Sequence, residues 1–166
     1  MRCLVRVACL ADARAIHELE SRVFTTDRLS RRSIRRLIAA GSARVLVGTN
    51  GHAIAAALVM LYRRGSAHAR LYSLAVDPRW RAQGIGSRLL SQALDRARRE
   101  GRSEMRLEVR RDNHAARSFY VGHGFVEAGR RERFYQDGET ALIYVRPTGS
   151  RRASPEPTRR PAVPTA

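Results

Sequence analysis

The sequence contains no lysine, so all 32 of its basic residues are arginines. Against them stand 15 acidic residues, which gives a formal net charge of +17, and the arginines are spread along the chain. We interpret most of them as solvated helix faces; the functional alternative is attraction for nucleotide phosphates, RNA or acidic peptides. The absence of lysine excludes any mechanism that uses a side-chain ε-amine.

Long apolar runs are also missing, because none of the 166 residues falls in a stretch near the about 18 to 20 that cross a bilayer. Charges interrupt the apolar residues at 1–14, so no signal peptide is expected. The two cysteines, Cys3 and Cys9, match no zinc or redox spacing and are expected to be reduced thiols. The five histidines show no metal-ligand spacing either. These features favour one cytoplasmic domain without a metal or a membrane partner.

Proline is scarce before residue 147, and five of the six prolines lie in the stretch PTGSRRASPEPTRRPAVPTA at 147–166. Proline lacks the N–H that helices and strand ladders need, and this stretch has no apolar periodicity. We therefore expect a disordered Arg/Pro-rich tail at 147–166. Before it, residues 1–146 predict one compact domain without internal repeats.

Strand-like and helix-like periodicities alternate through the domain. Ser30 is placed to cap a helix, and TNG at 49–51 suits a hairpin turn because Asn and Gly tolerate positive φ. The pattern predicts an α/β fold with a mixed sheet and helices on both faces. The expected strands are 2–8, 43–49, 52–62, 69–76, 104–110, 125–134 and 140–146, and the expected helices are 11–24, 30–41, 85–100 and 114–124.

The stretch RAQGIGS at 81–87 lies between a predicted strand and a predicted helix. A helix N-terminus leaves about four amide N–H groups unpaired and favours an anion. Gly84 and Gly86 let backbone approach that anion without a Cβ, and Arg81 adds a positive charge. Neither the P-loop nor the Rossmann pattern fits these residues. The stretch therefore indicates a pyrophosphate bound in some other way, with a plain tight turn as the alternative.

A second informative stretch is LEVRRDNHAARSFY at 107–120. Apolar residues alternate along its strand, so Glu108 points to the face opposite to them. Tyr120 lies on the helix that follows. A carboxylate at a strand end and a phenol on the next helix can act as general base and general acid. The alternative is a solvated glutamate and a half-buried tyrosine without a catalytic role.

Together the two stretches, with the "GF" at 124–125, resemble the GNAT acetyltransferase superfamily, and within it the bacterial ribosomal-protein alanine N-acetyltransferases. The resemblance covers about residues 2–146 and is strongest over 71–125. YQDGETAL at 135–142 is similar to the Y-x-D-G-E-D-A run of protein N-terminal acetyltransferases. This implies a mostly antiparallel central sheet, acetyl-CoA as co-substrate, and transfer of acetyl to a protein or peptide amine, with ribosomal proteins among the candidates.

The resemblance also implies roles for single residues. Glu108 matches the proposed base, and Tyr120 matches the residue that protonates the departing thiolate. Asn113 would hydrogen-bond the cofactor. The backbone that pairs with the pantetheine arm would come from Leu74, Ala75 and Val76, with the Val76 N–H polarising the thioester carbonyl. The pyrophosphate would lie on the loop of Arg81, Ala82, Gln83, Gly84, Ile85, Gly86 and Ser87.

The acceptor amine stays open at this point. Asp27 and Arg28 lie where the acceptor groove of the family begins, and His123 is close to Tyr120 in sequence, so all three are candidates to face the acceptor. A small-molecule amine, such as a polyamine or an aminoglycoside, is an alternative to a protein N-terminus. The arginine-rich helix at 30–41 disfavours polycations because like charges repel.

An arginine-rich RNA-binding protein is the alternative from a different class, with SRRASPEPTRR at 150–160 as its electrostatic arm. Aromatic residues make up only 6% of the chain, and no RNA-recognition fingerprint is present. Single-strand binders need aromatic stacking platforms. A nucleic-acid partner is therefore expected only through the basic tail.

Overall fold

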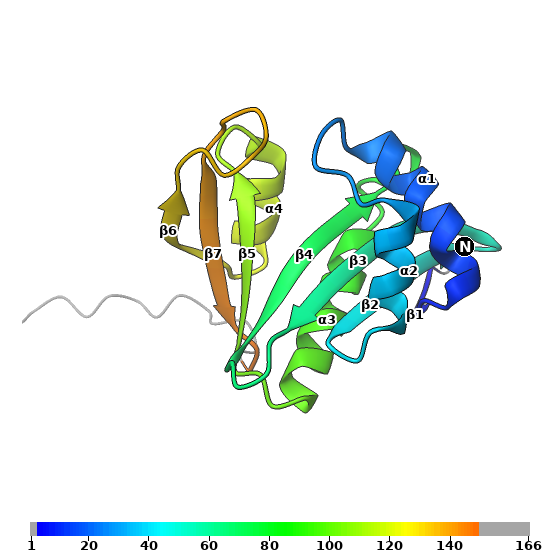
Figure 1. Ribbon diagram of the computed structural model, residues 1–166, viewed down its shortest axis with the longest axis horizontal. Coiled ribbons are helices and arrows are strands. Elements are labelled where there is room, and N and C mark those ends of the chain that lie inside the picture. Colours follow the sequence, from blue (N-terminus) through cyan, green and yellow to red (C-terminus); the bar gives the residue numbers. More distant parts are fainter. Residues whose placement is uncertain (1–2, 150–166) are drawn as a thin grey trace, which may run out of the picture.

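The computed structural model describes residues 3–149, in which seven strands form one sheet of order β1-β2-β3-β4-β5-β7-β6 (Figure 1). Within these residues β4 and β5 are the one parallel pair, and the other neighbours are antiparallel, as predicted. The strands are β1 Leu4–Val7, β2 Ala43–Asn50, β3 Ala53–Tyr62, β4 His68–Val76, β5 Glu104–Arg110, β6 Val126–Arg131 and β7 Ala141–Pro147. The helices are α1 Ala13–Val23, α2 Arg31–Ala39, α3 Ile85–Arg99 and α4 His114–Gly122, with short 3₁₀ turns at Leu10–Asp12 and Pro78–Trp80.

Helices cover both faces of the sheet, which confirms the predicted fold class (Figure 1). On one face α1 and α2 pack through a cluster that includes Ile16, Leu19 and Ile34. On the other face the apolar stripe of α3 packs on β1 to β5, and Tyr120 of α4 belongs to the same buried cluster. No helix within residues 3–149 is long and apolar enough to cross a membrane.

The ends of the elements follow the local sequence. Ser30 caps α2 as predicted, since its hydroxyl accepts a hydrogen bond from the Ser33 N–H at 3.1 Å. At the other end of the chain the sheet extends past the predicted boundary at residue 146. Pro147 pairs with Glu104 in the ladder, and the Thr148 N–H donates to the Ser103 carbonyl at 2.9 Å. The predicted tail from residue 150 onward lies outside the described residues.

The parallel strands β4 and β5 separate halfway along their length. Their pairing runs from His68–Glu104 to Leu71–Leu107, whereas β4 continues to Val76 and β5 to Arg110. Tyr72 is an extra residue on β4 at this point, because Met60 pairs with Leu71 and Val59 with Ser73. Such a bulge bends its strand and increases the local twist. The bend turns β4 away from β5, and Figure 1 shows the two strands diverging.

Asp77 fixes the chain where β4 ends. Its side chain is buried and accepts hydrogen bonds from the Arg79 N–H at 3.0 Å and the Arg79 guanidinium at 2.9 Å. Arg22 of α1 lies 3.3 Å from the same carboxylate. Hydrogen bonds from Arg79 hold the pKa of the Asp77 carboxyl well below its usual range. The end of β4, the turn after it and α1 are thereby joined by one buried charge.

We expect Asp77→Asn to lower the free energy of unfolding by about 2 kcal/mol at pH 7, because two guanidiniums lose a charged partner. A native pKa below the unfolded value of 3.8 stabilises the fold above that pH, and the stabilisation is lost as the pH falls. The gap between wild type and variant should therefore stay level from pH 7 to about pH 4 and shrink below that toward pH 2. Urea denaturation across this range measures it, and a gap that stays constant would contradict the role of the charge.

Candidate active site

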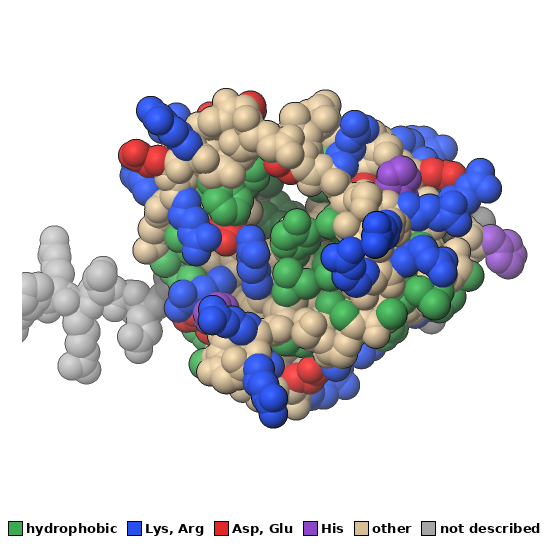
Figure 2. All heavy atoms as spheres, viewed as in Figure 1, with side chains coloured by type: hydrophobic (Ala, Val, Ile, Leu, Met, Phe, Trp, Pro, Cys, Tyr) green, Lys and Arg blue, Asp and Glu red, His purple; other side chains and the backbone are tan. Residues whose placement is uncertain are grey.

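A cavity of about 750 Å³ lies where β4 and β5 separate, between the α1–α2 loop and the β6–β7 loop. The space-filling view shows the molecule hollowed at this place (Figure 2). Its size is within the about 300–1,000 Å³ of small-molecule sites. The predicted residues that line it are Leu74, Glu108, Asn113, Tyr120 and the acceptor candidate Asp27, whereas Arg28 does not line it. Further walls come from Glu20, Phe24, Leu29, Arg70, Ser73, Arg110, Tyr135 and Asp137.

Glu108 and Tyr120 reach this cavity from opposite sides of the sheet. The Glu108 side chain, 13% exposed, lies on the face that α1 and α2 cover elsewhere. Tyr120 belongs to α4 and is buried in the cluster on the other face. They share one cavity because the sheet is open between β4 and β5. Burial raises the pKa of the Tyr120 phenol well above its usual range, so the group stays protonated at neutral pH.

Glu108 is held by arginines that the sequence pattern did not single out. The Arg70 Nε donates to its carboxylate at 3.0 Å, and an Arg131 nitrogen lies 3.9 Å away. Arg106 and Arg110, its neighbours on β5, are bonded to other carboxylates. The ion pair with Arg70 gives the Glu108 carboxylate a fixed orientation at the edge of the cavity.

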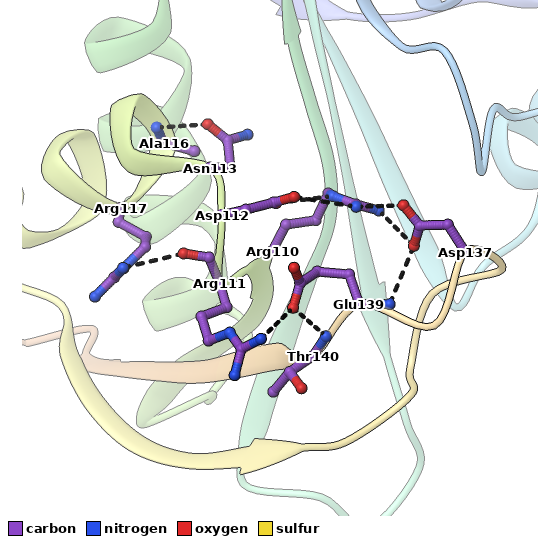
Figure 3. Close-up of polar contacts among 9 residues, drawn as sticks. All are labelled: Arg110, Arg111, Asp112, Asn113, Ala116, Arg117, Asp137, Glu139 and Thr140. Atoms are coloured by element: carbon purple, nitrogen blue, oxygen red, sulfur yellow. Dashed lines mark hydrogen bonds and ion pairs between the residues drawn. The ribbon is translucent and has the colours of Figure 1, made fainter.

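Arg110 joins the stretch at 107–120 to the YQDGETAL stretch at 135–142. Its guanidinium donates to Asp112 at 3.1 Å and to Asp137 at 3.2 Å, as Figure 3 shows. It also lies 4.8 Å from the centre of the Tyr135 ring. Asp137 and Tyr135 both belong to the β6–β7 loop. Arg110 therefore ties that loop to the end of β5 and shapes one wall of the cavity.

Tyr135 is a cavity residue that the sequence reasoning missed. Burial and the negative charge of Glu108 raise the pKa of its phenol to about 12. The group is therefore neutral at pH 7 and can donate a hydrogen bond into the cavity. The signal was present, because Tyr135 opens the quoted YQDGETAL stretch.

Glu20 is a second residue without a predicted role. It is buried on α1, where it accepts hydrogen bonds from the Ser73 hydroxyl at 2.6 Å and the Leu29 N–H at 3.3 Å. Burial raises the pKa of this carboxyl. Glu20 thereby connects α1 to β4 and to the α1–α2 loop. A carboxylate within the apolar stripe of a helix was the signal for it.

The glycines of the 81–87 stretch serve two different purposes. The backbone is left-handed at Ala82, with φ 61°, and at Gly84, with φ 78°. Gly84 begins α3 without a side-chain cap, so the first N–H groups of the helix face outward as in an anion-binding nest. A Cβ on Gly86 would lie 3.3 Å from Val76, so this glycine lets α3 pack on β4. Ile85 is buried in the core and offers only its backbone.

His123 lies beside this stretch and is not among the residues that line the cavity, and its place at the acceptor site stays a prediction. Its Nε2 is 2.9 Å from the Ser87 hydroxyl, and its Nδ1 is 2.6 Å from the Phe119 carbonyl. A carbonyl only accepts, so Nδ1 carries the proton that is donated to Phe119. His123 thus connects the end of α4 to the start of α3.

The remaining predicted residues fall beside the gap. Leu74, Ala75 and Val76 form the part of β4 that has no pairing with β5. In a strand the N–H and C=O groups of every second residue point to the same side, so alternate backbone groups of this segment point to the gap. The Ala75 side chain is buried. A ligand in the gap would therefore contact the backbone of this segment. Asn113 caps α4, since its Oδ1 accepts from the Ala116 N–H at 3.1 Å, which leaves its amide NH₂ to donate (Figure 3). In residues 3–149 no three His, Cys, Asp or Glu side chains gather as a metal site.

Comparison with known proteins identifies the family. The model of the acetyltransferase (GNAT) family matches residues 13–125. The Mycobacterium tuberculosis N-alpha-acetyltransferase RimI is 33% identical over 149 residues, which cover 84% of this chain and 89% of that protein. The Escherichia coli K12 ribosomal protein bS18-alanine N-acetyltransferase is 40% identical over 82 residues, which cover 48% of this chain and 55% of the relative.

The match to the Escherichia coli relatives thus spans about half of their length. The crystal structure of the Escherichia coli ribosomal-protein-S18-alanine N-acetyltransferase superposes with a TM-score of 0.80 at 26% identity, over 92% of this chain and 98% of that chain. The family match covers β4, the 81–87 stretch and α4, which carry the predicted resemblance. The chain belongs to the acetyltransferase (GNAT) family.

Proposed function

We propose that the protein transfers an acetyl group from acetyl-CoA to the free N-terminal amine of a protein or peptide. The observation that carries the proposal is the opening through the sheet, where Glu108 and Tyr120 line one cavity from opposite faces. Two relatives named for acetylating N-terminal amines, RimI and the bS18 enzyme, support this substrate class. A ribosomal acceptor and a cytoplasmic location stay predictions.

Acetyl-CoA, when bound, supplies an acetyl group activated as a thioester. The local features of the chain fit its two polar parts. The unpaired edge of Leu74, Ala75 and Val76 suits the amides of the pantetheine arm, and the Asn113 NH₂ is free to donate to it. The uncapped start of α3 at Gly84, with Arg81 exposed beside it, suits the pyrophosphate.

Proton transfers are assigned to two side chains. An α-amine has a pKa of about 7.7 to 8.0, so it must lose a proton before its nitrogen can attack the acetyl carbonyl carbon. The Glu108 carboxylate accepts that proton, directly or through a water molecule. The Val76 N–H donates to the carbonyl oxygen as the C–N bond forms. The bonded nitrogen releases its second proton to solvent as the C–S bond breaks, and Tyr120 gives its proton to the departing sulfur and regains one from solvent.

The acceptor class is tested by mass spectrometry with acetyl-CoA and four sets of amines. These are peptides with free N-termini, the same peptides with blocked N-termini, lysine-containing blocked peptides, and small amines such as polyamines and aminoglycosides. We expect acetylation of the first set alone. Acetylation confined to small amines would replace the proposed acceptor, and salt-dependent RNA binding without any acetyl transfer would replace the enzymatic function.

The two catalytic assignments predict different kinetic defects. Glu108→Gln should lower kcat about 100-fold at pH 7, because no carboxylate accepts the amine proton. Its residual rate should rise as the pH passes about 8, where the amine loses its proton in solution. Tyr120→Phe should lower kcat at least about tenfold with little change in the affinity for acetyl-CoA. Steady-state kinetics against pH measure both.

Each variant has a matched control on the same face of the sheet. Glu104→Gln removes a carboxylate of β5 that pairs with Arg106 and does not line the cavity. Tyr144→Phe removes a buried hydroxyl of the α3 and α4 cluster that bonds Arg117 at 3.3 Å. Both controls should keep wild-type rates. Equal losses in a variant and its control would remove the assigned role.

A further inference from the structure

A long part of the chain next to the cavity contains no acidic residue. From Arg28 to Val76 the sequence has arginines and two histidines, but neither aspartate nor glutamate. In this stretch Arg44 pairs with Glu100, and Arg70 pairs with Glu108, both from other elements. The stretch also contains all of α2, whose sequence is RRSIRRLIA. Positive charge there is not balanced from within the helix.

Four arginines of α2 form one exposed face, which we call the α2 arginine face. They are Arg31, Arg32, Arg35 and Arg36, and each is solvent-exposed. Among residues 3–149 the ion pairs to carboxylates leave all four out. Like charges at i and i+4 destabilise a helix, and this face has two such pairs. An anionic partner would relieve that repulsion.

The N-terminal end of the α2 arginine face lies near a wall of the cavity. Leu29 lines the cavity, and Arg31 follows it by two residues, so their Cα atoms are at most about 7 Å apart. Figure 2 shows basic side chains gathered over the position of α2, next to the hollow. A polypeptide with its N-terminal amine in the cavity can therefore pass over this face as it leaves.

The cavity itself has the opposite polarity. Its lining contains four carboxyl groups, those of Glu20, Asp27, Glu108 and Asp137, against two guanidiniums, those of Arg70 and Arg110, and this excess of acidic groups suits a cationic ammonium group. Guanidiniums outside suit carboxylates, which they bind in bidentate pairs. The nine residues of α2 span about 13 Å, the length of about four residues of extended peptide. The charge pattern thus matches a chain with a free amine at its end and acidic residues after it.

We infer that the α2 arginine face binds an acidic segment of the acceptor polypeptide, a few residues beyond the amine that enters the cavity. This inference rests on the proposed function and names its substrate class. Exposed ion pairs are individually weak, and several together should change kcat/KM about tenfold between acidic and neutral segments. A basic segment should be a poorer substrate than either.

The test uses three peptides with the same first three residues, followed by six residues that alternate serine with glutamate, glycine or arginine. We expect kcat/KM to fall in that order for the full-length protein. A variant with Arg31→Gln, Arg32→Gln, Arg35→Gln and Arg36→Gln should reduce the ratio of acidic to basic peptide to about one. Glutamine has a helix propensity close to that of arginine, so α2 should stay folded.

The matched control replaces Arg63, Arg64, Arg98 and Arg99 with glutamine. These arginines are exposed, change the net charge equally, and lie at the β3–β4 turn and the end of α3, away from the cavity. The control should keep the wild-type order of peptides. In the unmodified protein the preference should shrink as salt is raised from 0.02 to 0.5 M, because exposed charges are screened.

Three results would overturn the inference. One is equal kcat/KM for all three peptides, and another is an equal loss of preference in both variants. The third is a combination of two observations: the α2 variant keeps the wild-type peptide preference, and it loses binding of a single-stranded RNA. That combination would assign the α2 arginine face to nucleic acid. If none of the peptides is acetylated, the proposed function itself fails, so the two failures are distinguishable.

Discussion

The bulge at Tyr72 is the constraint on which the site depends. It lies one residue beyond Leu71, where the parallel pairing of β4 and β5 ends. An intact sheet would place Glu108 and Tyr120 on separate faces with no common space. Because β4 turns away, backbone groups lose their strand partner, a cavity passes between the faces, and side chains from both sides reach it. The 81–87 stretch that starts α3 follows the end of β4 after one short turn.

Arginines that form ion pairs with carboxylates and arginines that do not have different roles around that opening. Arg70 orients Glu108, Arg110 ties the β6–β7 loop to β5, and Arg22 and Arg79 hold the end of β4 through Asp77. In each case a carboxylate fixes the guanidinium, so these arginines stabilise the structure around the opening. The α2 arginine face has no such partner among the described residues, so its charge is available to another molecule. A single residue type thus serves both structure and recognition.

The sequence predicted features that depend on local chemistry. Helix and strand positions, the Ser30 cap and the place of Gly84 at a helix start follow from neighbours in the chain. Contacts between elements far apart in the sequence could not be predicted: Arg70 is 38 residues from Glu108, and His123 is 36 from Ser87. The bulge that creates the cavity also could not be predicted from the sequence, because it arises from pairing between β3 and β4. Catalytic roles for Glu108 and Tyr120 stay predictions until kinetics test them.

The central claim is that the open edge of β4 and the start of α3 together hold acetyl-CoA. Hydrogen–deuterium exchange of the amides, with and without acetyl-CoA, tests it most directly. The account predicts slower exchange at residues 72–76 and 82–87 when acetyl-CoA is added, with no change at the β2–β3 turn around Gly51. Binding of acetyl-CoA without protection of either segment would contradict it.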